Sequence, residues 1–386
     1  MKVLVCDYVG NSAQWLEQFA IKENLEVVST ITPETDKKLL AEKSWEYLLV
    51  FEQGARHFFT VLAQFMNINE NRVVYALDFD SWANHPSAMY ALLDPTRAEP
   101  AYRIATFNIA RQLNYFISTT TADNLHYIAT SKDISISSRM YITRQNFSED
   151  EMKLFHELVK QFYDIDDSEG LFLDLGANIG TTGIYFLKKL TPNLKLLAFE
   201  PDPENFKLLR TNLILNDIEE NSITENFGLG EVESEMTMYR VPENPGFNSV
   251  CFHKESDGRE SETINIITLD KYFAENKLSP KDIKYIWIDT EGFEAQVLLG
   301  MKNILTENPA PIFMEFNANA WNASGNYDKM FELLKNLYEG WIWIKEIYGA
   351  ETINVRPIEN LMEFKNSSIN GGEGLRDIFL IHEVKK

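Results

Sequence analysis

Apolar and polar positions in residues 1–77 switch repeatedly between strand-like and helix-like periods. Four short apolar runs have the character of strands: Val3–Cys6, Val27–Ile31, Tyr47–Phe51 and Val73–Leu77. Between them, apolar residues recur at helical spacing in Ser12–Asn24, Pro33–Lys43 and Ala55–Met66. This strand–helix repeat predicts a small parallel sheet with right-handed crossover connections.

The pattern becomes irregular over residues 78–125, where we expect a domain boundary. Pro86, Pro95 and Pro100 interrupt the first part, and Tyr102–Ile117 then has helical periodicity. We therefore predict an accessory α/β domain at residues 1–120 and a second domain at residues 121–386.

The second domain begins with short elements. Tyr127–Thr130 and Ile134–Ile136 favour two strands of a hairpin. Ser148 and Glu151 have the spacing of a capping box, and a helical stripe follows over Met152–Tyr163.

Strands and helices alternate after residue 170. We expect strands at Leu171–Leu175, Leu196–Phe199, Ser222–Phe227, Met236–Val241, Val250–His253, Ile264–Thr268, Tyr285–Asp289, Ile312–Phe316, Trp341–Ile347 and Ile378–His382. Helices are expected at Thr182–Leu190, from Pro203, at Ala295–Leu305 and at Tyr327–Tyr338. This order predicts a Rossmann-like α/β fold, with a mostly parallel sheet that an antiparallel last strand closes.

The first two of these strands end in polar residues that suit S-adenosylmethionine (SAM). Asp174 precedes a glycine turn that contains Gly176, Asn178 and Gly180, and Glu200 ends the next strand. A dinucleotide site is the rival, because its glycine turn also precedes an acid about twenty residues later. Asp174 would repel a pyrophosphate, and Asn178 occupies the position where the middle glycine must admit it. The pattern therefore favours a site in which Glu200 accepts the ribose hydroxyls of SAM.

A second acidic group follows the strand Tyr285–Asp289. Asp289 ends this strand at the carboxyl edge, where open α/β sheets bind ligands, and Glu291 follows in the turn. We predict that these two residues act as base and acceptor-positioning group. Alternatively, Glu291 or Glu294 stabilises the start of the following helix. Asn226 either meets the adenine or is a plain turn residue.

The loop Pro245–Ser249 is expected to cover the acceptor, so we predict substrate contacts for Asn248 and Ser249. Asn244–Phe247 resembles an element of methyltransferases that act on nucleic-acid bases, but Gly246 replaces a proline and the acidic charge disfavours that substrate. The six histidines lack ligand spacing, and we expect no metal.

Four blocks of the second domain resemble the FkbM-type SAM-dependent methyltransferases. They are Leu173–Gly180, Phe199–Asp202, Thr268–Asp270 and Ile288–Glu294, with Ile312–Glu315 after them. The resemblance covers about residues 125–386 and implies O-methylation of hydroxyls on natural products or sugars. The family often has Lys where Trp287 stands, which leaves any role of that Lys in doubt.

Composition limits the classes of partner that we expect the chain to bind. Its 386 residues have a net charge of −22, and residues 121–386 carry −18 of it, which disfavours nucleic acid. Two cysteines, the absence of a signal peptide and the absence of an apolar run of about 18–20 residues favour a cytoplasmic protein without a membrane span. We expect a small-molecule or glycan acceptor. The alternative is a binding or assembly protein whose N-terminal domain recruits a carrier or glycan; the sequence leaves the oligomeric state open.

Overall fold

The computed structural model describes residues 2–6, 26–31, 44–50, 73–75, 103, 106–165, 168–241, 244–251, 259–348, 352–363, 365 and 375–383. The chain divides into two compact units. The N-terminal unit comprises Met1–Ile117 and Tyr141–Thr143, and the C-terminal unit comprises Ser118–Met140 and Arg144–Lys386. Within the described ranges, no helix has the length and apolar character needed to cross a membrane.

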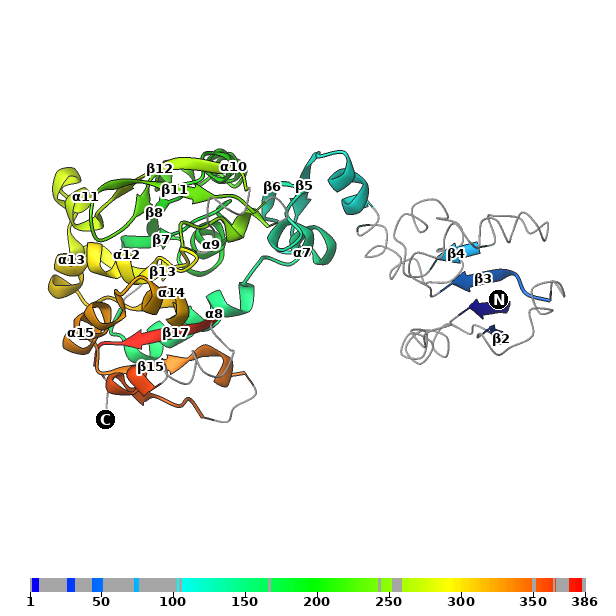
Figure 1. Cartoon of the computed structure of the whole chain (residues 1–386). Coiled ribbons are helices and arrows are strands. Elements are labelled where there is room, and N and C mark those ends of the chain that lie inside the picture. Colours follow the sequence, from blue (N-terminus) through cyan, green and yellow to red (C-terminus); the bar gives the residue numbers. More distant parts are fainter. Residues whose placement is uncertain are drawn as a thin grey trace. The chain divides into compact units, whose positions relative to one another are not determined.

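The N-terminal unit contains a sheet of four parallel strands (Figure 1). These are β1 Lys2–Cys6, β2 Glu26–Ile31, β3 Tyr47–Val50 and β4 Val73–Tyr75, in the order β2-β1-β3-β4. β1 has only apolar residues after Lys2 and is buried from Val3 to Cys6. The four predicted strands are confirmed, whereas the three helices predicted between them fall outside the described residues. An accessory or recruiting role of this unit stays a prediction.

An eight-stranded sheet forms the centre of the C-terminal unit. Its order is β16-β15-β17-β14-β13-β7-β8-β9. The strands are β7 Gly170–Leu175, β8 Leu194–Phe199, β9 Ser222–Glu225, β13 Ile283–Ile288, β14 Ile312–Asn317, β15 Gly340–Trp343, β16 Arg356–Pro357 and β17 Leu375–Ile381. Strands β14, β13, β7, β8 and β9 run parallel, and β17 is antiparallel to β14. The predicted Rossmann-like sheet with an antiparallel closing strand is confirmed.

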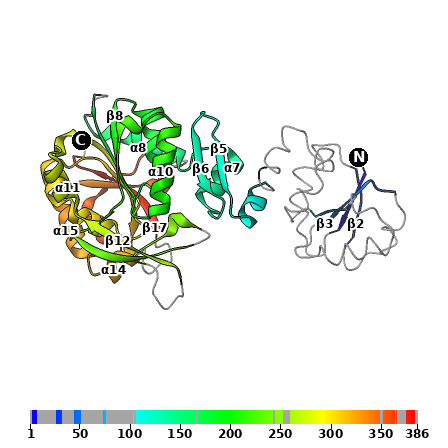
Figure 2. The same ribbon diagram turned by 90° about the horizontal axis from the view of Figure 1, so that it is seen from above.

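Helices pack on both faces of this sheet, and Figure 2 shows α10 separated from α11 and α15 by the strands. One layer contains α11 Leu269–Asn276, α12 Glu294–Gly300, α13 Lys302–Glu307, α14 Ala318–Ala323 and α15 Tyr327–Leu337. The other contains α8 Glu149–Phe162, α9 Thr181–Tyr185 and α10 Pro203–Leu215. Because both faces are covered, the central strands are almost continuously apolar and buried.

Aromatic side chains fill the face of the sheet beneath α8. Phe155 of α8 contacts the rings of Tyr285, Trp287, Phe313 and Phe379, which lie on three adjacent strands. Trp287 and Phe313 are register partners and stack with ring centroids 4.1 Å apart. Trp287 therefore has a packing role at the position where the FkbM family often has Lys.

Two smaller sheets are separate from the main sheet. β5 Phe116–Thr120 pairs with β6 His126–Thr130. β10 Gly228–Leu229, β11 Ser234–Tyr239 and β12 Ser261–Ile267 form the second, in which β11 and β12 are antiparallel as predicted.

Several predicted elements near residue 130 are wrong. Ile134–Ile136 is not a strand, because the Asp133 carboxylate accepts hydrogen bonds from the N–H groups of Ser135, Ile136 and Ser137 and starts helix α7, Ile136–Thr143. The predicted capping box is also wrong, since Ser148 has a φ of 52° and makes no side-chain cap hydrogen bond. The helix predicted up to Ile117 ends by residue 112, where β5 follows.

Three other predicted elements differ in extent. The predicted helix Ala295–Leu305 is broken at Met301 into α12 and α13. The helix after the glycine turn is α-helical only to Tyr185 and continues as a π-helix over Phe186–Leu190. The strand predicted at Trp341–Ile347 ends at Trp343, because a 3₁₀ turn follows at Ile344–Glu346. Apolar periodicity does not record such local breaks.

Candidate active site

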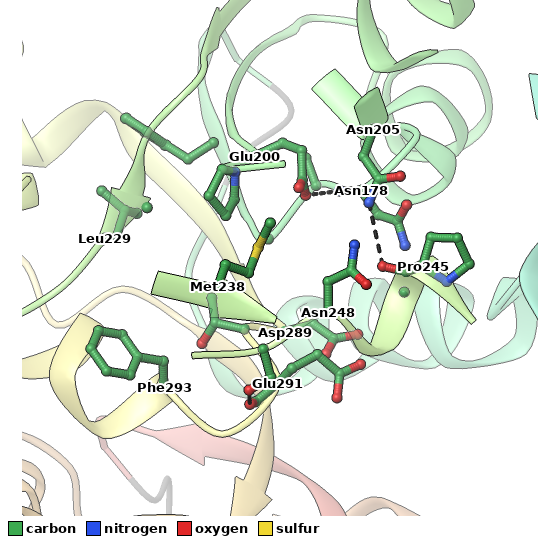
Figure 3. A pocket seen from close by; sticks show the side chains of 18 of the residues that line it. Asn178, Glu200, Asn205, Leu229, Met238, Pro245, Asn248, Asp289, Glu291 and Phe293 are labelled. Carbon is green, nitrogen blue, oxygen red and sulfur yellow. Dashed lines mark hydrogen bonds between the residues drawn. The ribbon is translucent and has the colours of Figure 1, made fainter. Parts of the chain in front are cut away.

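A cavity of about 320 Å³ lies at the carboxyl ends of β7, β8, β13 and β14 (Figure 3). This is the edge at which open α/β sheets bind ligands, next to the point where the strand order reverses between β13 and β7. Of the predicted site residues, the cavity wall contains Gly176, Asn178, Glu200, Asn248, Ser249, Asp289 and Glu291. Asp174, Gly180 and Asn226 lie outside this wall.

The turn after β7 fits tightly between its neighbouring strands. The N–H groups of Gly176 and Ala177 donate to the carbonyl oxygen of Phe199 at 3.0 and 2.9 Å. Gly176 has a φ of 94°, and a Cβ atom there would overlap the carbonyl oxygen of Asp289. Only glycine meets both conditions, so this residue allows the ends of β7, β8 and β13 to converge.

Glu200 is buried at the cavity wall and is held on both carboxylate oxygens. Oε2 accepts the N–H of Asn178 at 2.8 Å, and Oε1 accepts the N–H of Asp202 at 2.8 Å. Burial raises the pKa of Glu200 to about 8, although these N–H groups counteract the rise and the charges of Asp202 and Asp174 add to it. The carboxylate therefore has a fixed position.

Asp174 lies behind the turn and supports it from inside the protein. Its side chain is 1% exposed, and Oδ2 accepts the N–H of Gly183 at 3.0 Å, at the start of α9. Burial raises the pKa of Asp174 to about 7, against the opposing effect of the Gly183 N–H. A contact between Asp174 and the methionine end of SAM stays a prediction.

Asn226 has a similar supporting position. Its amide nitrogen donates to the carbonyl oxygens of Glu200 and Pro201 at 2.8 and 3.0 Å. These bonds tie the end of β9 to the loop that contains Glu200. The predicted contact with adenine is not tested by this arrangement.

The opposite wall of the cavity is acidic. Asp289 follows β13, and its N–H donates to the carbonyl oxygen of Leu175 at 2.9 Å. The Asp289 side chain is exposed to the cavity, which protein surrounds. Burial, followed by the charges of Glu294, Asp377 and Asp174, raises the pKa of Asp289 to about 7.

Glu291 and Glu315 complete this acidic wall. Each has a buried Oε2 atom without a hydrogen-bond partner among the described residues. Burial and the charges of Asp289 and Glu294 raise the pKa of Glu291 to about 9. Burial and the same carboxylates, with Glu291 and Asp377, raise the pKa of Glu315 to about 10. The two side chains thus favour the protonated form in the ligand-free protein.

Glu294, by contrast, has its hydrogen bonds made within the protein. Oε1 accepts the N–H groups of Thr290 and Gly292 at 3.0 Å, and Oε2 accepts Nε1 of Trp321 at 2.9 Å. These hydrogen bonds of the Glu294 carboxylate go to the loop before α12 and to Trp321, so its role is structural but is not the helix cap that was predicted. This loop sets the positions of Asp289 and Glu291.

The loop over the cavity is tied to both walls. Asn248 donates to Oδ2 of Asp202 at 2.8 Å and accepts the N–H of Val241 at 2.7 Å. Ser249 donates to the carbonyl oxygen of Glu291 at 2.8 Å. The side chains of Asn248 and Ser249 thus hold the loop closed against the Glu200 and Glu291 segments, and their contact with a substrate stays a prediction.

The sequence reasoning gave no role to several residues of the cavity wall. Glu315 lies within β14, three residues after Ile312, and its signal was an acid after a buried apolar run. The cavity wall also contains an apolar group, most of which comes from the sheet of β10, β11 and β12. Its residues are Phe227, Leu229, Met238, Ile264, Ile266 and Phe293. No sequence signal distinguished these from ordinary core residues.

Comparison with known proteins agrees with the predicted resemblance. Residues 174–339 match the family model of the methyltransferase FkbM domain. Methyltransferase sdnD of Sordaria araneosa is 26% identical over 243 residues, which cover 56% of this chain and 86% of that protein. Methyltransferase 1 of Beauveria bassiana (strain ARSEF 2860) is 25% identical over 173 residues, covering 39% of this chain and 68% of that protein.

Solved structures include a methyltransferase FkbM from Methylobacillus flagellatus KT. It is 15% identical, has a TM-score of 0.30, and the similarity covers 86% of this chain and 84% of that one. The family assignment depends on the sequence match, which contains the glycine turn, Glu200 and the Asp289 loop. Residues 174–339 of this chain therefore match a methyltransferase domain of the FkbM type.

Proposed function

We propose that the C-terminal unit is a SAM-dependent O-methyltransferase. The observation that carries this proposal is the position of Glu200 and Asp289 on the walls of one cavity, at the ends of β8 and β13. Glu200 is fixed by two N–H donors, whereas Asp289 is open to the cavity. One acid thus suits the binding of a cofactor and the other the chemistry.

The donor set of the cavity fits SAM. The described wall contains four carboxylates and no Lys, Arg or His, which suits a cationic cofactor and opposes a pyrophosphate. Glu200 would accept the ribose hydroxyls, and the backbone from Gly176 to Asn178 would lie along the methionine part. The apolar group of Phe227, Leu229 and Met238 suits the adenine ring. When bound, SAM supplies an electrophilic methyl group on a sulfonium.

Asp289 is the proposed general base. Its pKa of about 7 leaves a large ionised fraction at neutral pH and keeps the carboxylate basic enough to accept a proton from a hydroxyl. The acceptor oxygen would give its proton to Oδ of Asp289 and bond to the methyl carbon as the bond from that carbon to sulfur breaks. The electron pair of the broken bond would stay on sulfur, and S-adenosylhomocysteine would leave. Positioning of the acceptor against the fixed cofactor supplies the rest of the rate enhancement.

The proposal is tested by mass spectrometry of products formed from methyl-labelled SAM and a cell extract. We expect a labelled O-methyl product with the wild type and at least a 100-fold loss of label incorporation with Asp289→Asn. Asp328→Asn, which changes an exposed acid on α15, is the matched control and should retain the wild-type rate. Label on nitrogen or carbon, or equal rates for both variants, would contradict O-methylation with Asp289 as base.

A further inference from the structure

The acidic wall of the cavity indicates the class of acceptor. We propose that the acceptor carries an ammonium group beside its reacting hydroxyl, and that Glu315 and Glu291 select it. This inference rests on the proposed function, because it assumes that SAM fills one part of the cavity and that the acceptor binds in the remaining part. Glu315 and Glu291 would be specificity-determining residues, distinct from the base.

The two strands that form this wall place their carboxylates side by side. Met314 of β14 pairs in parallel register with Ile288 of β13. The next residues along these strands are Glu315 and Asp289, and both are on the cavity wall. Glu291 comes from the loop that follows, and it also lines the cavity, so three acids belong to this wall.

Two oxygen atoms of this region lack a partner. Oε2 of Glu291 and Oε2 of Glu315 are shielded from solvent and accept no hydrogen bond from the described residues. Buried polar atoms in folded proteins are almost always hydrogen-bonded, so an exception on a cavity wall leaves room for a donor from a ligand, an ion or a water. An ammonium group has three donors and no acceptor, which matches a group of carboxylate oxygens.

The charges that face these two side chains are all negative. Asp289 and Glu294 act on both residues, and Asp377 of β17 acts in addition on Glu315. Glu294 is already bonded to Trp321 and to the loop, so its oxygens are not available to a ligand. Beyond the cationic groups that SAM would bring, the described wall has no Lys, Arg or His to pair with an anionic acceptor such as a phosphate or uronate.

Protonation gives this proposal a specific signature. In the ligand-free protein, Glu291 and Glu315 retain protons at neutral pH because burial raises the pKa of each. An ammonium group stabilises the ionised carboxylates, so its binding should release protons to the buffer. A neutral polyol would bind to the protonated side chains without such a release.

Three small probes test the proposal on the full chain saturated with S-adenosylhomocysteine (SAH). Ethanolamine, ethylene glycol and glycolate share a two-carbon hydroxyl frame and differ by a cationic, neutral or anionic group. In ligand-observed NMR, we expect ethanolamine to bind at least five-fold more tightly than ethylene glycol, and glycolate not to bind. Calorimetry of ethanolamine in two buffers of different ionisation enthalpy should show proton release.

Glu315→Gln should reduce the preference for ethanolamine at least three-fold, while the SAH affinity stays within two-fold of the wild type. The control is Glu332→Gln, which makes the same change at an exposed site on α15 and should leave the preference unchanged. Equal binding of the probes, absence of ethanolamine binding, or an unchanged preference in Glu315→Gln would overturn the inference. Displacement of ethanolamine by Mg²⁺ alone would overturn it in favour of a metal.

Binding of SAH separates this inference from the proposed function. If SAH binds but ethanolamine is not preferred, only the acceptor class is wrong. If SAH itself does not bind to the wild type, the cofactor site is wrong and the acceptor assignment fails with it.

Discussion

The two sides of the cavity treat their carboxylates in opposite ways. At the ends of β7 and β8, both carboxylate oxygens of Glu200 accept backbone N–H groups, whereas Asp174 accepts one on Oδ2 and has no described partner for Oδ1. At the ends of β13 and β14, Glu291 and Glu315 each have a buried oxygen without a described partner. On the cavity wall itself, Glu200 is therefore bonded within the fold on both oxygens, whereas Glu291 and Glu315 each keep an oxygen that is not.

The difference indicates two roles: Glu200 holds a ligand in a fixed position, whereas Glu291 and Glu315 change their protonation when a ligand binds. Backbone N–H groups fix the Glu200 carboxylate before any ligand arrives, which reduces the entropy lost on binding. Burial, followed by the charges of Asp289 and Glu294, raises the pKa of Glu291 and of Glu315, so both side chains retain protons that a cationic ligand would displace. The comparison predicts that substitutions on the first side affect folding and cofactor affinity, whereas those on the second affect turnover and pH dependence.

The largest effect is expected at the glycine turn on the first side. Gly176→Ala combines a φ of 94° with an overlap between its methyl group and the carbonyl oxygen of Asp289, so we expect a loss of about 3 kcal/mol or more in the free energy of unfolding. Gly325→Ala is the matched control: its φ is 72°, but no heavy atom lies within 4 Å of the new Cβ. It should cost about 1 kcal/mol. Urea denaturation followed by circular dichroism compares them, and equal losses would contradict a tight turn.

On the second side, Asp289 should control the pH profile of turnover. A base must be ionised, so kcat/KM should rise as pH increases through about 7 and then level off. Asp289→Asn should remove this rise and lower turnover by about 100-fold or more, with little change in SAH affinity. A rise that persists in Asp289→Asn would assign the titration to another group.

Glu315 should make stability fall with increasing pH. Its pKa is about 10 in the fold and 4.5 as an ordinary side chain, so between these values the unfolded chain releases a proton that the folded chain retains. The free energy of unfolding then falls by up to about 1.4 kcal/mol per pH unit for this group. Glu315→Gln cannot titrate and should give a shallower fall between pH 5 and 9 than Glu332→Gln. Parallel curves for the two variants would show that Glu315 ionises freely.

The smallest effect is expected for the loop that joins the two sides. Asn248→Ala removes the bonds to Asp202 and Val241, which should cost about 1–2 kcal/mol of stability. Ser249→Ala removes the bond to the Glu291 carbonyl oxygen and serves as the comparison from the other wall. Thermal unfolding measures both. If Asn248→Ala alone lowers acceptor binding with unchanged stability, a direct substrate contact is the better explanation.

The sequence predicts the first side of the cavity better than the second, because the residues of the first side lie in short segments with a recognisable spacing. Gly176, Asn178 and Glu200 lie in short segments whose spacing constrains the turn, and the structure places all three on the cavity wall. Glu315 and the apolar group around Met238 reach the cavity through strand pairing and through the small sheet, which no local pattern encodes.

Errors in the predicted elements have the same origin. Asp133 starts helix α7 with its side chain where three residues resemble a strand, and Ser148 lacks the cap that its spacing with Glu151 suggests. Spacing identifies candidate hydrogen bonds, but backbone geometry decides whether they form. The alternating order of buried strands and helices was sufficient for the fold itself.

The most direct test of the account is calorimetric titration of SAM into the wild type, Glu200→Ala and Glu332→Gln. We predict one SAM per chain for the wild type and for Glu332→Gln. Glu200→Ala should bind about 10- to 100-fold more weakly, because it removes a fixed acceptor for the ribose hydroxyls. Undiminished binding to Glu200→Ala, or no binding to the wild type, would contradict the cofactor site at the ends of β7 and β8.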